Sequence, residues 1–184
     1  MLSGMLGKRN IYLIGPMGTG KSAVGRHIGR LMGVTFYDSD AEIERHAGVD
    51  IPYIFEREGE ARFRAREREA LVALCQKEPI VLATGGGAVL APENRKLLHE
   101  TGIVVYLETS LTHQLHRVGK GRGRPLLKDA DLPARLAELR TVRDPLYREI
   151  ADVTLSTDNR RVARVANLVL DELGIKPIEP RDGG

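Results

Sequence analysis

The sequence reads Gly15-Pro16-Met17-Gly18-Thr19-Gly20-Lys21-Ser22 between an apolar run at residues 11–14 and a segment with a helical pattern. In that segment, apolar residues recur at i, i+4, i+7 and i+8 from Val24, on one helical face. The octapeptide matches G-x-x-x-x-G-K-[ST], the motif of a phosphate loop, in the strand-loop-helix context that the motif requires. An ordinary glycine-rich turn is the alternative. The stretch therefore predicts a binding site for a nucleoside triphosphate.

The chemistry of this loop also predicts a metal ion. Glycines let the backbone turn tightly and point its N–H groups at phosphate oxygens near a helix N-terminus. Lys21 adds positive charge toward the β- and γ-phosphates, and the hydroxyl of Ser22 suits Mg²⁺, which bridges the same phosphates. The residues that we expect to bind the nucleotide here are Gly18, Thr19, Gly20, Lys21, Ser22 and Ala23.

The chain as a whole has 184 residues, 42% of them hydrophobic, which predicts a single domain over residues 1–184 with a sizeable core. Its only cysteine, Cys75, excludes disulfides and suits a core position and a reducing, cytoplasmic location. No run has the pattern of a secretory signal or the length of a membrane span. Net charge is only +3, with basic and acidic residues interleaved, so we expect no nucleic-acid partner. We also expect a monomer that binds small molecules.

Five β-rich runs alternate with helical segments. They lie at residues 11–14, 34–37, 80–84, 103–107 and 153–155. This alternation predicts an α/β fold with a parallel sheet covered by helices, in which ligands bind at the carboxyl ends of the strands. Gly33 predicts the end of the first helix, and Asp38 or Ser39 could cap the next. Residues 176–184 show no periodicity, which predicts a frayed tail.

Two aspartates follow the second predicted strand. Asp38 and Asp40 are two residues apart, which in an extended segment places both carboxylates on the same side of the chain. One could then serve the metal and the other the substrate. A helix-capping pair is the alternative, and the two roles are compatible.

Residues 85–87 are three consecutive glycines after the third predicted strand. Because they cost backbone entropy with no side chain to compensate, the close approach of a ligand to bare backbone is the favoured cause, with a flexible turn as the alternative. Residues 56–69 alternate acids and arginines as a solvated helix does. Arg64 differs because the neighbouring Phe63 marks the inward face, where an arginine can bind a carboxylate through two nitrogens.

The segment from Arg117 to Arg124 is the local exception to the balanced charge, with four basic residues and three glycines. Glycine spacing gives mobility and arginine gives phosphate affinity, so residues 117–128 predict a lid that closes over the nucleotide and excludes water. A nucleic-acid-binding loop is the alternative, but no aromatic residues are interleaved.

Taken together, the motifs resemble the shikimate kinase family, a branch of the small phosphate-loop kinases, from residue 11 to about residue 158. They are the loop at residues 15–22, Phe36-Tyr37-Asp38-Ser39-Asp40, Phe63-Arg64, Thr84-Gly85-Gly86-Gly87, Arg124-Pro125-Leu126-Leu127 and Arg143-Asp144-Pro145-Leu146-Tyr147. The resemblance implies a three-layer α/β/α phosphate-loop NTPase fold with a five-stranded parallel sheet ordered 2-3-1-4-5. It also implies transfer of the ATP γ-phosphate to the 3-hydroxyl of shikimate, in aromatic amino acid biosynthesis.

The resemblance also implies roles for individual residues. Lys21 would hold the phosphates, Asp40 would accept or orient the attacking hydroxyl, and Arg124 from the lid would neutralise the transferring phosphate. Ser22 would ligate Mg²⁺, with Asp38 in its shell. Arg64 and Arg143 would bind the substrate carboxylate, and Gly85, Gly86 and Gly87 would face its ring. Arg117 would lie against the adenine. Residues 39–75 would form the substrate-binding insertion.

One segment departs from the family pattern. Where family members often place a proline against the adenine, this chain reads Thr157-Asp158-Asn159-Arg160-Arg161-Val162, so the rest of the adenine pocket stays open. A kinase for another small acceptor, such as gluconate or a nucleoside monophosphate, is an alternative function. A nucleotide-dependent switch, as in GTPases, is another, although the chain lacks the N-K-x-D guanine motif and its only D-x-x-G, at Asp171, ends the last predicted helix.

Overall fold

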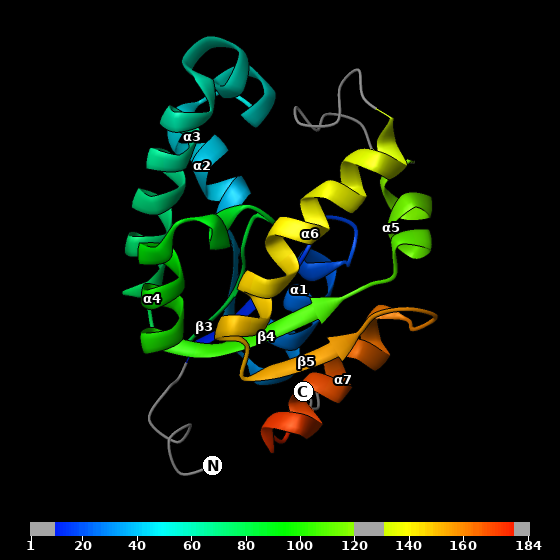
Figure 1. Cartoon of the computed structure of the whole chain (residues 1–184). Coiled ribbons are helices and arrows are strands. Elements are labelled where there is room, and N and C mark those ends of the chain that lie inside the picture. The colour runs from blue at the N-terminus through cyan, green and yellow to red at the C-terminus, as the bar shows by residue number, and fades with distance from the viewer. Residues whose placement is uncertain (1–9, 120–130, 179–184) are drawn as a thin grey trace.

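The computed structural model describes residues 10–119 and 131–178, which form a three-layer α/β/α domain. Five parallel strands make one sheet in the order β2-β3-β1-β4-β5, which confirms the expected topology (Figure 1). The strands are β1 (Asn10–Ile14), β2 (Thr35–Asp38), β3 (Ile80–Ala83), β4 (Gly102–Glu108) and β5 (Val153–Ser156). Each predicted run coincides with one strand to within one residue at either end.

Helices follow every strand. They are α1 (Lys21–Met32), α2 (Ser39–Ala47), α3 (Ile51–Cys75), the short 3₁₀ helix η2 (Ala88–Leu90), α4 (Pro92–Thr101), α5 (Leu111–Val118), α6 (Leu132–Ile150) and α7 (Val162–Leu173). Helices α1 and α7 pack on one face of the sheet, and α3, α4 and α6 pack on the other. None of the helices in the described ranges has both the length and the apolar character that a membrane crossing needs.

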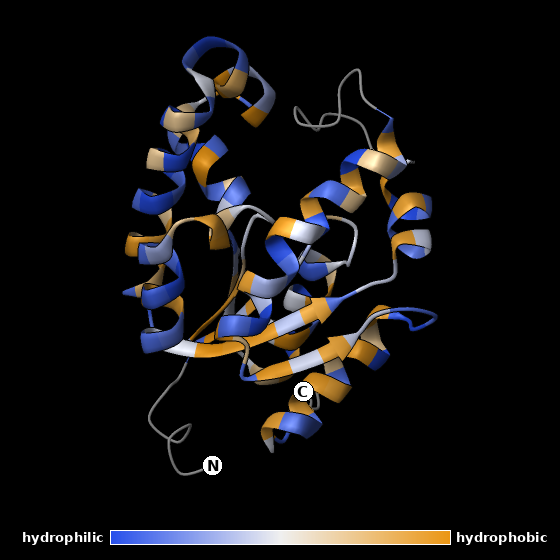
Figure 2. Ribbon diagram, in the orientation of Figure 1, coloured by the Kyte–Doolittle hydropathy of each residue, from blue (hydrophilic) through white to orange (hydrophobic). Residues whose placement is uncertain are grey.

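The core forms because the central strands bury side chains on both faces, as parallel strands under two helix layers do. In β1, Tyr12 and Ile14 pack beneath α3, α4 and α6, whereas Ile11 and Leu13 pack beneath α1 and α7. Figure 2 shows this as apolar strands inside helices whose outer faces are polar. Cys75 is buried in the first of these clusters, so its predicted core position is confirmed.

Two pairs of helices project beyond the carboxyl edge of the sheet, α2 with α3 on one side and α5 with α6 on the other (Figure 1). The first pair makes up most of residues 39–75 and has a small core of its own, with Ile43, Ile54 and Phe63 at its centre. Of the predicted lid, residues 117–119 are described and residues 120–128 lie outside the described ranges. Residues 179–184 of the predicted tail also lie outside them.

Local signals placed the helix ends correctly. Gly33 ends α1 with a φ of 66°, in the left-handed conformation that glycine adopts without strain. The side chain of Asp38 caps α2 by accepting from the backbone N–H of Asp40 and Ala41 at 2.9 and 3.1 Å. Strand β2 therefore passes directly into a helix at the carboxyl edge of the sheet.

Candidate active site

The phosphate loop joins β1 to α1 and depends on its glycines. Gly15, Gly18 and Gly20 have φ values of 141°, 83° and 85°, a region that other residues rarely adopt. In addition, a Cβ atom at Gly15 would clash with the carbonyl oxygen of Leu107 on β4. The predicted tight turn is confirmed, and it lies against the neighbouring strand.

Lys21 opens α1 and folds back over this loop. Its Nζ donates to the carbonyl oxygens of Gly15 and Pro16 at 2.8 and 2.9 Å. The side chain is largely buried, so its charge is fixed at the loop instead of being free in solvent. This geometry suits the phosphate-binding role that we predict for Lys21.

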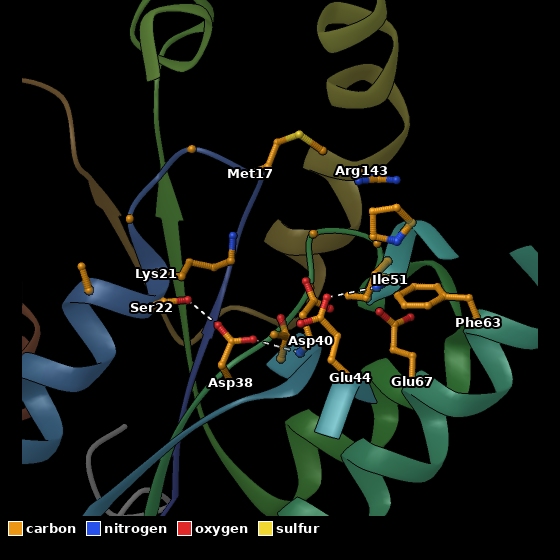
Figure 3. A pocket seen from close by; sticks show the side chains of 18 of the residues that line it. Met17, Lys21, Ser22, Asp38, Asp40, Glu44, Ile51, Phe63, Glu67 and Arg143 are labelled. Atoms are coloured by element: carbon orange, nitrogen blue, oxygen red, sulfur yellow. Dashed lines mark hydrogen bonds between the residues drawn. The ribbon is translucent and has the colours of Figure 1, made fainter. Parts of the chain in front are cut away.

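Asp38 uses its two oxygens differently. Oδ1 caps α2, and Oδ2 accepts a hydrogen bond from the hydroxyl of Ser22 (Figure 3). The expectation that residues 38–40 are extended is wrong, because the cap turns the chain at Ser39 and places Asp40 in the first turn of α2. Both carboxylates nevertheless line the same cavity.

Asp40 lies beside a second acidic side chain, Glu67 of α3. A Cβ atom at Gly85 would be 2.8 Å from Oδ1 of Asp40 and 3.2 Å from Oε2 of Glu67, so both oxygens lie against that glycine. Neither oxygen has a hydrogen-bond partner among the described residues. Burial, reinforced by the charge of Asp38, raises the pKa of Asp40 to about 6. Burial also raises the pKa of Glu67 to about 7, despite the nearby Arg64.

Glu67 is a charged cavity residue that the sequence analysis did not predict, because it belongs to a stretch interpreted as a solvated helix. It is 1% exposed. Its burial could nevertheless have been predicted from the sequence. At helical spacing, Glu67 falls on the same face as three apolar residues that are also buried, Phe63, Leu71 and Leu74. Burial of a carboxylate on such a face costs free energy unless it has a partner. An acid among apolar residues at this spacing was therefore the feature that pointed to a site residue.

Two guanidinium groups lie along the glycine wall at residues 85–87. A Cβ atom at Gly87 would be 2.6 Å from both terminal nitrogens of Arg64, and one at Gly86 would be 3.4 Å from Nη1 of Arg143. Arg64 is held by Oε1 of Glu67 at 3.0 Å. Arg143 is 5% exposed, and burial lowers its pKa.

The glycine wall therefore lies against side chains from α2, α3 and α6. None of the three glycines has a positive φ, so no turn demands them. A Cβ atom at Gly85 or Gly87 would instead displace the end of the Asp40 or Arg64 side chain, which lies against this backbone. Approach of a ligand to the same backbone remains a prediction.

Most of the predicted site residues meet in one cavity of about 680 Å³. Those that line it are Gly18, Gly20, Lys21, Ser22, Ala23, Asp38, Asp40, Arg64, Gly85, Gly86, Gly87, Arg117 and Arg143. The side chain of Thr19 is instead buried in the loop, where its hydroxyl donates to the carbonyl oxygen of Pro16. Arg124 lies outside the described residues.

Arg117, at the end of α5, connects two loops. Its Nη1 donates to the carbonyl oxygen of Gly18 at 3.1 Å, and its Nη2 donates to the carbonyl oxygen of Thr157 at 3.4 Å. The side chain therefore lies between the phosphate loop and the segment after β5. Contact with adenine remains a prediction for this residue.

We expect Glu67→Gln to stabilise the protein at about pH 8 on the order of 1–3 kcal/mol, and to leave its stability unchanged at about pH 4. The folded-state pKa is raised to about 7, so the ionised form costs stability above that pH, whereas below the unfolded pKa the side chain is neutral in both states. Glutamine keeps an oxygen that can accept from Arg64. Urea unfolding at both pH values measures the difference.

The control for this experiment is Glu60→Gln, because Glu60 also pairs with Arg64, at 3.2 Å, but is 54% exposed. It should show no such pH dependence. A Glu67→Gln protein that is less stable than the parent at pH 8 would show that the pair with Arg64 outweighs the cost of burial.

Comparisons with known proteins agree with this geometry. A sequence profile for the family described as shikimate kinase matches residues 17–174. The shikimate kinase of Thioalkalivibrio sulfidiphilus is 55% identical over 156 residues, which cover 85% of this chain and 82% of that protein. The shikimate kinase of Methylococcus capsulatus is 56% identical over 153 residues, covering 83% and 86%. The structure of shikimate kinase from Acinetobacter baumannii in complex with shikimate matches with a TM-score of 0.88 at 45% identity, covering 94% of this chain and 97% of that one. The chain belongs to the shikimate kinase family.

Proposed function

We propose that this protein transfers the γ-phosphate of ATP to the 3-hydroxyl of shikimate, giving shikimate 3-phosphate and ADP. One observation carries the proposal: Figure 3 shows Lys21 and Ser22 on one side of the cavity, Arg143 on the other and Asp40 between them, and Arg64 lines the same cavity. A nucleotide and an acid bound at these two ends would bring the γ-phosphate and a ring hydroxyl to the same carboxylate. Family membership and the Acinetobacter baumannii complex support this choice of acceptor.

The acceptor end fits a small carboxylic acid. Arg64 and Arg143 both lie on the glycine wall, and guanidinium groups bind carboxylates through two parallel hydrogen bonds. Burial removes competing water, so each bond is worth more than it would be at the surface. We propose that these arginines bind the carboxylate of shikimate and that the backbone of residues 85–87 faces its ring.

Phosphoryl transfer passes through a loose transition state, so catalysis depends mainly on aligning the two substrates and neutralising charge on the phosphates. We propose that Lys21 and the backbone N–H groups of residues 18–23 hold the phosphates. Asp40 would orient the attacking hydroxyl and take up its proton. Arg124, which lies outside the described residues, would neutralise the phosphate in transfer, and Arg117 would lie against the adenine.

The start of α1 fits a Mg²⁺ ion. The hydroxyl of Ser22 and the carboxylate of Asp38 are hydrogen-bonded to each other and offer the oxygen ligands that Mg²⁺ prefers. Across the described residues, no group of three or more His, Cys, Asp or Glu side chains could hold a metal. This agrees with a Mg²⁺ ion that is bound mainly by nucleotide phosphates and water. When bound, the ion would neutralise charge on the phosphates.

We expect Arg64→Ala to raise the KM for shikimate about 10- to 100-fold, since a charge-assisted hydrogen bond to the substrate is lost. The KM for ATP should change less than about twofold, because Arg64 lies at the acceptor end. The matched control is Arg66→Ala, two residues along the same helix, where the guanidinium pairs with Glu58 at 2.9 Å. An equal rise in both KM values would contradict the placement of Arg64 at the substrate carboxylate.

The function itself is tested by ADP release with Mg²⁺-ATP and a panel of acceptors. Shikimate should support turnover, whereas gluconate and nucleoside monophosphates should not. Turnover with gluconate alone would establish the alternative kinase. Failure of every acceptor, with nucleotide binding intact, would favour a nucleotide-dependent switch.

We also propose that the protein acts as a monomer in the cytoplasm, on small molecules and without nucleic acid or a membrane. The buried thiol of Cys75 suits a reducing compartment. The interleaved charges give no broad basic stripe for nucleic acid. Light scattering coupled to size exclusion, with and without nucleotide, tests the monomer.

A further inference from the structure

The segment that joins β5 to α7 contains no proline from residue 157 to residue 162, so its shape must come from hydrogen bonds. Thr157 makes two of them, since its N–H and its hydroxyl both donate to the carbonyl oxygen of Glu108, at 2.9 and 3.2 Å. Asn159 follows in the left-handed conformation, with a φ of 56°. The turn is therefore tight and is bound to the end of β4.

Asp158 attaches this turn to α5. One of its oxygens accepts from the hydroxyl of Thr109 at 2.7 Å. Both oxygens accept from the backbone N–H of Ser110, the residue that caps α5, at 3.1 and 3.0 Å. These hydrogen bonds outweigh the effect of burial and hold the pKa of Asp158 below its ordinary value. Thr109 is 3% exposed and Asp158 is partly buried, so the Thr109 side of this contact is shielded from water.

The other end of α5 is attached to the phosphate loop. Gln114 donates to the carbonyl oxygen of Met17 at 2.9 Å, and Arg117 donates to that of Gly18. Arg117 also donates to the hydroxyl of Thr157, at 3.4 Å. Thr157, the residue before Asp158, is thus one of the two residues that hold the guanidinium group of Arg117.

An arginine side chain has many rotamers, and it acts at a fixed place only where its nitrogens find fixed acceptors. For Arg117 these acceptors are Gly18 in the phosphate loop and Thr157 in the turn. Thr157 precedes Asp158 in this turn, so the contacts of Asp158 with Thr109 and Ser110 add to the hydrogen bonds with Glu108 in holding Thr157. Without the contacts of Asp158, the two oxygens of Thr157 that accept from Arg117 would be held less firmly.

We propose that Asp158 is a positioning residue of the nucleotide site: it binds the turn after β5 to the start of α5 and so keeps Thr157 in place to orient Arg117. The inference rests on the proposed nucleotide-binding function and deepens it on the adenine side. Asp158 itself does not line the cavity and acts through Arg117.

The test is the affinity for ADP, measured by titration calorimetry without an acceptor. Asp158→Ala should weaken ADP binding about tenfold, and Asp158→Asn, which keeps one acceptor oxygen, about threefold. Arg117→Ala should weaken ADP binding about as much as Asp158→Ala does. The double variant should bind ADP no more weakly than Arg117→Ala alone, because both changes remove the same interaction.

The matched control is Asp152→Asn. Like Asp158, Asp152 accepts from a backbone N–H, but its donor is Val104 at 2.8 Å, near the start of β4 and away from the cavity. This variant should lose stability and keep its affinity for ADP within about twofold. The KM for shikimate should stay unchanged in all of the Asp158 variants.

Unchanged ADP affinity in a folded Asp158→Ala protein would overturn the proposal, as would additive losses in the double variant. If Asp158→Ala does not fold, Asp158→Asn and Thr109→Val decide, since each removes part of the same contact; unchanged affinity in both would overturn it. A parent protein that binds ADP but does not phosphorylate shikimate would contradict the proposed function alone.

Discussion

Lys21→Ala is expected to lower kcat by about 1,000-fold or more, because it removes the buried positive charge that we propose holds the phosphates in transfer. The ammonium group is bound by the carbonyl oxygens of Gly15 and Pro16, and residues 15–22 contain no other lysine or arginine. The helix should persist, since alanine is a good helix former and the loop conformation is set by its glycines. ADP release at saturating ATP and shikimate measures the loss.

The control for this variant is Lys96→Ala, because Lys96 is 74% exposed on α4 and lies outside the cavity. It should keep the activity of the parent protein. A Lys21→Ala protein that melts like the parent and retains more than about a tenth of its kcat would contradict the role assigned to Lys21.

Asp40→Asn should lower kcat by about 100-fold at about pH 8, with little change in the KM for ATP. The folded-state pKa of about 6 means that the side chain is ionised at this pH and can accept a proton, which asparagine cannot. Asparagine keeps the size of the side chain and its ability to hydrogen-bond to a hydroxyl. The variant therefore separates proton transfer from orientation.

Loss of fold is not an expected explanation for this result. Because the pKa of Asp40 is raised, its charge costs stability above about pH 6, and the neutral amide should make the protein at least as stable there. The matched control is Asp171→Asn, on an exposed part of α7. Full activity of Asp40→Asn would show that no carboxylate is needed, and a loss below about tenfold would limit Asp40 to orienting the hydroxyl.

The parts of the site that were predictable depend on short-range chemistry. The phosphate loop is contiguous, and its glycines are needed for backbone angles that can be inferred residue by residue. Strand positions follow from apolar runs, and the cap at Asp38 follows from its residue type before a helix. Local reasoning also has a limit here. Because Asp38 caps α2, the helix begins at Ser39, and residues 38–40 are not extended as expected.

Resemblance supplied what the local patterns could not. Nothing in the residues around Arg143 distinguishes it from other arginines, and it was placed at the acceptor only through the family motif. In the structure it is buried on α6 against Gly86, which lies 57 positions earlier in the chain. Only the packing of α6 over the carboxyl edge of the sheet creates that contact.

The sequence by itself determined the sheet, the phosphate loop and the class of ligand, because hydrophobic periodicity and the conformational freedom of glycine act within a few residues of one another. Only the tertiary structure decided that Glu67 lies buried beside Asp40 and that Asp158 binds the start of α5. The cost of burying a charge and the direction of a hydrogen bond depend on groups that are distant in the chain. Residues 15–22 predicted a nucleotide site. The packing of helices that are distant in the sequence determined which side chains lie at its proposed acceptor and adenine sides.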